Sequence, residues 1–318
     1  MSEPENELIS NLAIVIPSFN EEQNLEILFR RISGEMEKQA GVNWRIIFVD
    51  DGSTDGTWER IRDLKQENPE RIYAKRLSRN FGHQAALVCG LGQVKPTEAA
   101  IMMDADLQHD PEYIPIMLEK AAQGFDIVQG KRRKSKSGQT LKPLLSRLFY
   151  RLINFISTEK IEPDAPDFRY VSPRVASALK EYTESNMFLR GIISFIGFRK
   201  TTFFYVEKPR HAGQAGYSSL KSALLALDGI MSISIHPIRV SLVCGVLCEL
   251  LAFLYALYAL FIKFFYDEIV IKGWTSIIIL MLFLHGVLFF LIGIIGEYVG
   301  KSYLESKKRP LYHVSDDL

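Results

Sequence analysis

Two long apolar segments, residues 240–262 and 274–295, constrain most strongly what this chain can fold into. Each holds about 22 residues, and a helix that rises about 1.5 Å per residue crosses a hydrocarbon core of about 30 Å at that length. The sequence therefore predicts two C-terminal transmembrane helices, which form a hairpin over residues 239–296.

Basic residues flank this hairpin on both outer sides, whereas its loop carries no excess of positive charge. The loop, residues 263–273, balances two lysines against Asp267 and Glu268. The flanking basic residues are Lys208, Arg210, Lys221 and Arg239 before the hairpin and Lys301, Lys307, Lys308 and Arg309 after it. Because lysine and arginine accumulate on the cytosolic side of membrane proteins, we expect both termini in the cytosol. The opening MSEPENELISN is acidic and polar, so no secretory signal is expected there.

The first 130 residues alternate patterns that are typical of strands and of helices. Strands are expected at residues 12–17, 44–50, 71–77, 99–104 and 125–130, and helices from about residue 21, at 57–67, from about 83 and after Pro111. The apolar strands indicate an α/β fold, with a mostly parallel sheet that helices cover on both faces. With 47% hydrophobic residues and a formal charge of +1, the chain has ample material for a core and no signature of nucleic-acid binding. Ligands of such sheets bind at the carboxyl ends of the strands.

Two further stretches connect the predicted sheet to the hairpin. Residues 131–142 contain six basic residues and no acid, so a mobile loop is expected. Residues 141–157 place apolar residues at helical spacing, and residues 218–235 lead to the first span; each is either an amphipathic helix in the bilayer interface or a helix packed on the core. The expected domains are a cytosolic domain over residues 1–217, a juxtamembrane helix over 218–238, the hairpin, and a cytosolic tail over 297–318.

Three aspartates, Asp104, Asp106 and Asp110, follow the fourth predicted strand. Side chains two positions apart on an extended segment point the same way, so Asp104 and Asp106 can bind one ligand together. Mg²⁺ is typically held by one or two carboxylates and by substrate phosphates. Asp110 precedes a proline and is expected to cap the next helix, which is also the alternative role for the other two. Because Asp50 and Asp51 end a strand of the same sheet, the crevice would be costly without a cation, which favours a metal site.

Motifs along nearly the whole chain resemble those of a known enzyme family. PSFNEEQNL (17–25), VDDGSTDGT (49–57), LSRNFGHQAAL (77–87) and DADLQHDPE (104–112) resemble inverting family-two glycosyltransferases with the GT-A fold. Later motifs are similar to the bactoprenol glucosyltransferase branch of the polyisoprenyl-phosphate glycosyltransferases, which are relatives of dolichol-phosphate mannose synthase. These are DFRYVSPR (167–174), FLRGIISFIGF (188–198), RHAGQAGYSSLK (210–221) and GEYVGKSYLESKKRPLY (296–312). The set of motifs is specific, although no single one is.

The resemblance implies an activity and its partners. A Rossmann-like GT-A domain would transfer a sugar from a nucleotide diphosphate sugar to a polyisoprenyl phosphate at the cytosolic face of the bacterial inner (plasma) membrane. UDP-glucose is the leading donor, with other UDP-sugars and GDP-mannose behind it, and undecaprenyl phosphate is the leading acceptor. Mg²⁺ or Mn²⁺ would be the cofactor. Relatives also imply a homo-oligomer, such as a tetramer, packed through the spans.

The resemblance also implies roles for individual residues. The implied donor contacts are Pro17, Phe19, Glu21, Asp50, Asp51, Asp104 and Asp106. The implied metal contacts are Asp104, Asp106 and Gln108. The implied catalytic residues are Asp106, Asp167, Arg132 and Arg210, with the two arginines on phosphate groups. The implied acceptor-phosphate region holds Arg169, Arg210, Ala215 and Tyr217.

The chemistry of the acceptor predicts the mechanism. A phosphate monoester has a second pKa of about 6, so it is already a charged nucleophile at neutral pH. We therefore expect direct displacement with inversion, in which positioning and stabilisation of the leaving diphosphate dominate, without an indispensable general base. Asp167 is the strongest rival candidate for such a base; orienting the acceptor or holding Arg169 are equally open roles.

One motif departs from the family pattern. The loop after Arg210 usually reads G-x-[ST]-[K]-[YF] in the family, whereas residues 213–217 read GQAGY in this chain. Ala215 therefore lacks a hydroxyl, and a lost phosphate hydrogen bond would cost about 1 kcal/mol. We expect this difference to lower the rate or the affinity several-fold without abolishing activity.

Three other functions stay open on the sequence alone. A processive polysaccharide synthase of the same fold normally carries more spans and a Q-x-x-R-W element, which this sequence lacks. A catalytically inactive membrane scaffold is disfavoured by the intact Asp104, Asp106 and Arg210. A lipid flippase is disfavoured because two transmembrane helices can line only a small part of a route for a lipid across the membrane.

Overall fold

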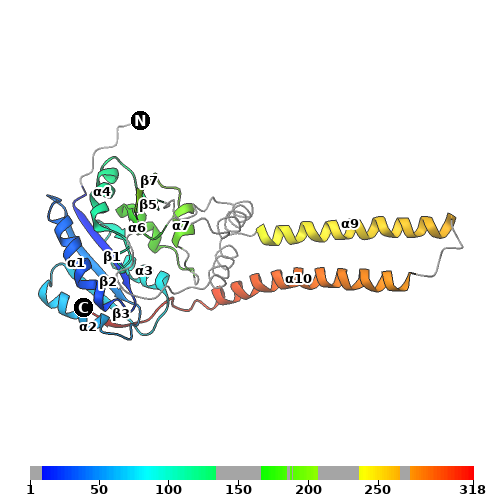
Figure 1. The fold of residues 1–318 in the computed structure, drawn as a ribbon, viewed down its shortest axis with the longest axis horizontal. Helices are drawn as coiled ribbons and strands as arrows, with labels where there is room; N and C mark the ends of the chain where they lie inside the picture. Colours follow the sequence, from blue (N-terminus) through cyan, green and yellow to red (C-terminus); the bar gives the residue numbers. More distant parts are fainter. Residues whose placement is uncertain (1–8, 134–165, 185–186, 188, 207–235, 266–272) are drawn as a thin grey trace. The chain divides into compact units, whose positions relative to one another are not determined.

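The structure is a computed structural model that describes residues 9–133, 166–184, 187, 189–206, 236–265 and 273–318 (Figure 1). The chain divides into two compact units. One unit carries an eight-stranded sheet with its helices and includes Arg309–Leu318, and the other carries two long helices. The predicted helices at 141–157 and 218–235 lie outside the described residues.

The first unit alternates strands and helices in the predicted order. Its elements are β1 (Asn11–Ser18), α1 (Glu22–Met36), β2 (Asn43–Asp50), α2 (Thr57–Glu67), β3 (Ile72–Leu77), α3 (His83–Gly92), β4 (Ala99–Met102), η1 (Pro111–Tyr113), α4 (Ile114–Ala122), β5 (Ile127–Arg132), β6 (Arg169–Val171), α6 (Pro173–Lys180), α7 (Leu189–Phe195), β7 (Lys200–Tyr205) and β8 (Val314–Asp317). The α/β interpretation is therefore confirmed. The prediction that the fourth strand reaches Asp104 is wrong: β4 ends at Met102, since the chain turns there and Leu107 adopts a φ of +62°.

The sheet is mostly parallel, as predicted, with two antiparallel strands. Its order is β7-β5-β6-β4-β1-β2-β3-β8. β6 runs antiparallel to both of its neighbours, β4 and β5, and β8 runs antiparallel to β3. In the register of β4 with β6, Met102 lies opposite Arg169. The start of β6 therefore lies at the same edge of the sheet as the carboxyl ends of β1, β2 and β4.

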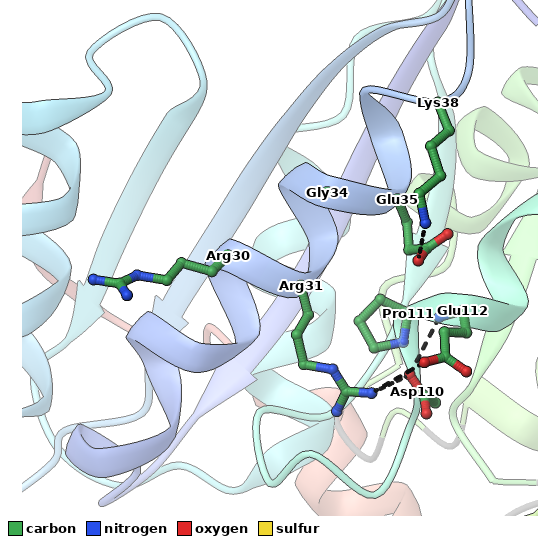
Figure 2. Close-up of a pocket in the computed structure, with 8 residues that line it drawn as sticks. All are labelled: Arg30, Arg31, Gly34, Glu35, Lys38, Asp110, Pro111 and Glu112. Atoms are coloured by element: carbon green, nitrogen blue, oxygen red, sulfur yellow. Dashed lines mark hydrogen bonds and ion pairs between the residues drawn. The ribbon is translucent and has the colours of Figure 1, made fainter.

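Asp110 fixes the turn between β4 and the helical segment that follows. Its Oδ1 atom accepts hydrogen bonds from the Glu112 backbone N–H at 3.2 Å and from the Arg31 side chain at 2.6 Å, so the predicted capping role is confirmed. Figure 2 shows Arg31 reaching from α1 to Asp110 beside a cavity of about 250 Å³. The contact ties α1 to the turn that carries Asp104 and Asp106.

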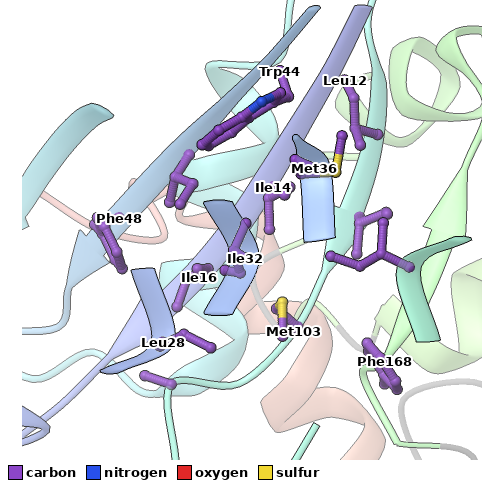
Figure 3. Packing of buried hydrophobic residues seen from close by; sticks show 14 of the residues in the cluster. Leu12, Ile14, Ile16, Leu28, Ile32, Met36, Trp44, Phe48, Met103 and Phe168 are labelled. Atoms are coloured by element: carbon purple, nitrogen blue, oxygen red, sulfur yellow. The ribbon is translucent and has the colours of Figure 1, made fainter. Parts of the chain in front are cut away.

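Alternating residues of the strands pack against helices on the two faces of the sheet. Leu12, Ile14 and Ile16 of β1 belong to a cluster with Leu28, Ile32 and Met36 of α1, as Figure 3 shows. Ala13 and Val15 face the opposite cluster, which contains residues of α3, α6 and α7. Burial of each aliphatic side chain stabilises the folded state by about 1.5–3 kcal/mol. Because helices cover both faces of the sheet, nearly every position in these strands is buried, which explains their continuous apolar sequence.

Two glycines allow the backbone to approach closely where the sheet requires it. A Cβ atom at Gly90 of α3 would lie 2.3 Å from Cγ1 of Val15, so the missing side chain lets α3 lie directly on β1. Gly52, after β2, has a φ of +68°, and a Cβ there would lie 2.4 Å from the backbone of Arg79. Glycine therefore permits the turn after β2 to pack on the loop after β3.

The second unit contains helices at both predicted spans. α9 covers His236–Phe265 and α10 covers Trp274–Ser306. Within the described part of the chain, one stretch, Phe283–Ser306, is long and apolar enough to cross a membrane, and a shorter apolar stretch occupies Gly245–Tyr255. A two-span topology therefore stays a prediction.

The last residues of the chain form a strand that the sequence did not reveal. β8 (Val314–Asp317) adds to the sheet beside β3 and lies in the same unit as the sheet (Figure 1). Residues 297–318 are thus divided between the end of α10 and the edge of the sheet.

Candidate active site

The candidate site lies at the carboxyl edge of the sheet, where polar residues follow β1, β2, β3 and β4. After β1 and β2, two turns hold each other: the Asn20 backbone N–H donates to the Ser53 hydroxyl at 2.9 Å, and the Thr54 backbone N–H donates to the Asn20 side chain at 2.9 Å. The Asp50 carboxylate accepts the Ser53 backbone N–H at 2.9 Å. These hydrogen bonds therefore hold together the turns after β1 and β2, which carry several of the predicted donor contacts.

Asp50 and Asp51 are buried but remain partnered. The Arg76 Nε atom lies 3.1 Å from Asp50 Oδ2. The two oxygens of Asp51 accept the backbone N–H groups of Phe81 at 2.7 Å and Gly82 at 2.9 Å. Burial raises the pKa of both carboxyl groups, and these partners oppose that effect. Asp51 therefore fixes the loop after β3, in addition to the predicted donor contact.

Three other predicted donor contacts lie on or just after β1. Pro17 is buried within the strand, whereas Phe19 is 42% exposed. The Glu21 carboxylate accepts the Asn24 side chain at 2.5 Å, and its backbone N–H donates to the Thr57 hydroxyl at 2.8 Å. The exposed ring of Phe19 is available for stacking, and Glu21 anchors the start of α1.

Asp104 and Asp106 lie on the turn after β4 rather than on an extended strand. The Asp106 carboxylate accepts the Gln108 backbone N–H at 3.1 Å. His109 Nδ1 accepts the Asp104 backbone N–H at 3.0 Å, and its ring stacks on Phe168 with centroids 4.7 Å apart. His109 therefore fixes the shape of the turn from a buried position.

The residues of this turn fit a divalent cation. Asp104 Oδ1 is a buried oxygen that accepts no hydrogen bond among the described residues, which is costly for a carboxylate. Asp106 supplies a second carboxylate close by in the chain. No cluster of three or more His, Cys, Asp or Glu side chains with metal-binding geometry occurs in the described ranges. Two carboxylates without a full protein cage are typical of Mg²⁺ that is also held by substrate phosphates.

Asp167 lies at the centre of a buried polar network. It precedes β6, whose reversed direction brings it to the edge where β4 ends. Its carboxylate accepts hydrogen bonds from Arg169 at 2.6 Å, Arg190 at 3.0 Å and Gln84 at 3.1 Å. Burial tends to raise the pKa of Asp167, but the hydrogen bond from His83 and the charges of the two arginines hold it well below its usual range.

His83 connects this network to the candidate metal site. Its Nε2 atom lies 3.3 Å from Asp167 Oδ2 and 3.6 Å from Asp104 Oδ1. Burial lowers the pKa of His83, but the hydrogen bond to Asp167 and the charges of both aspartates outweigh it, so the pKa is raised. Because 42% of the His83 side chain is exposed, this link is accessible from solvent.

The remaining predicted residues are only partly described. Arg169 is 1% exposed, and its guanidinium donates to Asp167 and to the Pro166 carbonyl at 3.1 Å, so Asp167 does hold Arg169. Its predicted contact with the acceptor phosphate remains a prediction. Arg132 is exposed at the end of β5. Arg210, Ala215 and Tyr217 lie outside the described residues.

A larger cavity of about 720 Å³ lies at the opposite edge of the sheet. It is lined by residues near the amino ends of the strands, among them Asn11, Ala99 and Asp126. Its position separates it from the carboxylates of the candidate site.

Four residues of the candidate site did not follow from the sequence. His83 and Gln84 lie in the motif 77–87, His109 lies in the motif 104–112, and Arg190 lies in the motif 188–198. The motifs drew attention to these segments, but a motif without geometry does not show which side chain reaches Asp104 or Asp167.

Family profiles match both units of the chain. The profile of glycosyl transferase family 2 matches residues 13–179, and the profile of the GtrB C-terminal hairpin matches residues 236–302. The chain therefore belongs to glycosyl transferase family 2, and it is a glycosyltransferase with a GT-A-like fold.

Named relatives match over almost the whole chain. The chain is 36% identical over 305 residues to the bactoprenol glucosyl transferase of Shigella phage SfX, which covers 95% of this chain and 97% of that protein. It is 39% identical over 306 residues to the uncharacterized glycosyltransferase sll0501 of Synechocystis, with 96% and 95% covered. A solved glucosyl-3-phosphoglycerate synthase from Mycobacterium tuberculosis, in complex with Mn²⁺ and UDP, aligns with a TM-score of 0.41 and 16% identity over 64% of this chain and 73% of that one. That likeness is too distant to support residue assignments.

Proposed function

We propose that this glycosyltransferase transfers a hexose from a nucleotide diphosphate sugar to a polyisoprenyl phosphate at the cytosolic face of a bacterial membrane. The leading donor is UDP-glucose, and the leading acceptor is undecaprenyl phosphate. The observation that carries the proposal is the juxtaposition of Asp104, whose buried Oδ1 atom accepts no hydrogen bond among the described residues, with the His83–Asp167 network at one edge of the sheet. The names of the bactoprenol glucosyl transferase relatives support the acceptor and the sugar.

Asp104, Asp106 and Gln108 would hold Mg²⁺ or Mn²⁺. When bound, the cation would neutralise charge on the leaving diphosphate. The Oδ1 atom of Asp104 supports this assignment, since it is buried and accepts no hydrogen bond among the described residues, and such an oxygen gains most from a cationic ligand. Arg132 and Arg210 would contribute guanidinium groups to the phosphates.

Direct displacement by the acceptor phosphate needs no base from the protein. Asp167 is surrounded by two arginines and a histidine, and its pKa lies well below its usual range. A carboxylate with so low a proton affinity is a weak base, but it is well suited to hold Arg169 and Arg190 in place. We assign it a positioning role, with inversion at the anomeric carbon.

The second unit would anchor the enzyme in the bilayer as a two-span hairpin. The lengths of α9 and α10, the apolar stretch Phe283–Ser306 and the match to the GtrB C-terminal hairpin support this. The basic residues on both outer flanks favour cytosolic termini. Assembly as a homo-oligomer through these helices is part of the proposal.

The decisive experiment measures transfer of radiolabelled glucose from UDP-glucose into lipid that organic solvent extracts. Membranes that contain the full-length protein, Mn²⁺ and undecaprenyl phosphate should produce labelled lipid, and the Asp106→Asn variant should produce at least about 100-fold less, since an essential charged contact is lost. Label in a long water-soluble polymer would favour a processive synthase, and no transfer from any donor would favour an inactive scaffold.

A thermal-shift screen would identify the donor. A true donor raises the free energy of unfolding by RT ln(1 + [L]/Kd), which is about 2.7 kcal/mol at a donor concentration of 100 times Kd. UDP-glucose, other UDP-sugars and GDP-mannose are compared with Mg²⁺ or Mn²⁺. Stabilisation by GDP-mannose alone would overturn the choice of UDP-glucose.

A further inference from the structure

The C-terminal strand β8 is bonded to β3, the strand that leads into the candidate donor site. The backbone groups of Ala74 and Leu318 exchange hydrogen bonds of 3.0 and 2.9 Å, and the Ser78 N–H donates to the His313 carbonyl at 2.9 Å. These bonds bracket the strand pair at its two ends. The chain segment 311–318 therefore runs along β3 from Ala74 to its end and reaches the loop that follows it.

Side chains of segment 311–318 add further contacts to these backbone hydrogen bonds. Leu311 and Tyr312 pack against the hydrophobic cluster that includes residues of α3. The ring of His313 lies 6.2 Å from that of Phe81, centroid to centroid, at an interplanar angle of 56°. The Arg79 guanidinium also contacts the Phe81 ring, 4.2 Å from its centroid. Phe81 is therefore supported by both His313 and Arg79.

Phe81 belongs to the short loop that holds Asp51. Its backbone N–H and that of Gly82 donate to the two oxygens of Asp51. Arg76, which lies opposite Asp316 in the strand register, contacts Asp50. Two adjacent carboxylates of the candidate donor site are thus held by residues that contact segment 311–318.

We propose that segment 311–318 is a positioning element for the donor site, in which His313 holds Phe81 and thereby the Asp51 loop. The proposal rests on the proposed function only in identifying Asp50 and Asp51 with donor binding. The effect on the loop does not depend on the proposed function, because the segment stabilises one loop conformation before any ligand binds. Preorganisation of this kind improves binding because less ordering remains to be done when the ligand arrives.

If β8 only covered the edge of the sheet, weakening it would affect a different set of residues. An edge strand protects the unpaired backbone groups of its neighbour, and weakening it lowers stability along the whole of β3. A positioning role through His313 predicts a local effect instead, which is confined to the Phe81–Gly82 amides and to donor affinity.

The test compares three variants of the full-length protein. His313→Ala removes the ring, His313→Phe retains a ring that can contact Phe81, and Asp317→Asn alters the same strand at the exposed ion pair with Lys75, which is worth little. Hydrogen–deuterium exchange of the Phe81 and Gly82 amides should be roughly two- to fivefold faster in His313→Ala, since ring contacts contribute on that scale. Exchange should match wild type in the other two variants.

Kinetics supply the second measurement. The KM for UDP-glucose should rise by roughly the same factor in His313→Ala, while kcat and the KM for undecaprenyl phosphate stay unchanged, and His313→Phe should restore the donor KM. Unchanged exchange at Phe81 and Gly82 in His313→Ala, or equal acceleration throughout β3, overturns the proposal. If the wild type transfers no sugar, the proposed function fails, and the exchange measurement alone decides the positioning role.

Discussion

The Nε2 atom of His83 lies 3.3 Å from Oδ2 of Asp167, so a half-exposed imidazole at the start of α3 contacts a carboxylate that is almost wholly buried. The same nitrogen lies 3.6 Å from Asp104. One side chain therefore connects the two acidic positions of the candidate site, and the enzyme's geometry at this edge should depend on it.

Substitution of His83 tests this connection. His83→Ala should lower kcat about tenfold, because a hydrogen bond to a charged group is worth about 1.5 kcal/mol. The measurement is labelled-lipid formation at saturating donor and acceptor. Arg62→Ala, which removes an exposed partner of Glu59 on α2, is the matched control and should retain full activity. Equal activity of the two variants would show that the imidazole has no role in the reaction.

The pH dependence of an Asp167 variant tests the absence of a general base. Asp167→Asn should lower kcat between about pH 5 and 9 and should remove no ionisation of Asp167 itself, because the pKa of Asp167 lies well below its usual value of about 3.9. The substitution should move only the ionisation of His83, to lower pH, because Asp167 raises the pKa of that imidazole. The measurement is the pH–rate profile at saturating substrates. If the substitution abolishes an ionisation that both the wild type and His83→Ala show in this range, Asp167 acts as a base after all.

A buried ion pair far from the site should control acid stability. Arg45 donates to both oxygens of Glu98, at 2.8 and 2.7 Å. Burial raises the pKa of Glu98, but the bonds from Arg45 and the Lys95 amide outweigh it, so the folded-state pKa is lowered. The stabilisation is therefore present above the unfolded pKa of about 4.3 and is lost as the pH falls through the lower folded pKa.

Removal of the Glu98 charge should reproduce this loss at neutral pH. Glu98→Gln leaves Arg45 without its countercharge and should cost about 3 kcal/mol, measured by thermal unfolding followed through Trp44 and Trp58. Glu26→Gln, which breaks the exposed pairs with Arg30 and Arg60, should cost less than about 1 kcal/mol. The two variants should also differ in acid: only Glu98→Gln should flatten the decline in stability below pH 4.3. Similar costs for both would contradict the assignment.

Two glycines in helices should respond to alanine with opposite signs. Gly90→Ala places a Cβ 2.3 Å from Val15 and should destabilise the sheet unit by about 1–3 kcal/mol. At Gly34, within α1, no described atom lies within 4 Å of the added Cβ, so Gly34→Ala should stabilise by about 0.5–1 kcal/mol. Unfolding midpoints of both variants, measured side by side, test the close contact of α3 with β1.

The apolar strands and their spacing were sufficient to predict the alternating architecture. Runs such as residues 12–17 and 44–50 are buried on both faces, so local sequence and tertiary environment agree there. The end of β4 was placed two residues too late, at Asp104, because Met103, which follows the strand, is still apolar. β8 was missed because VSDD has weak strand propensity, and it is held by its pairing with a distant strand.

The acidic residues of the candidate site could be predicted from the sequence, but the contacts between its side chains could not. Asp104 and Asp106 are recognisable from their position after a buried strand. The contacts of Asp167 with His83, Gln84 and Arg190 join residues that are 84, 83 and 23 positions apart, and only the sheet brings them together. Such contacts depend on strand order and direction, which periodicity does not encode.

The reversed direction of β6 has a consequence for how relatives of this enzyme can diverge. Three residues of β6 are hydrogen-bonded between β4 and β5, which locks the height at which Asp167 enters the edge beside Asp104. The length and composition of the chain between residues 133 and 166 can then change without displacing that carboxylate. The pairing of β6 therefore sets the position of Asp167 independently of the segment that connects β5 to β6.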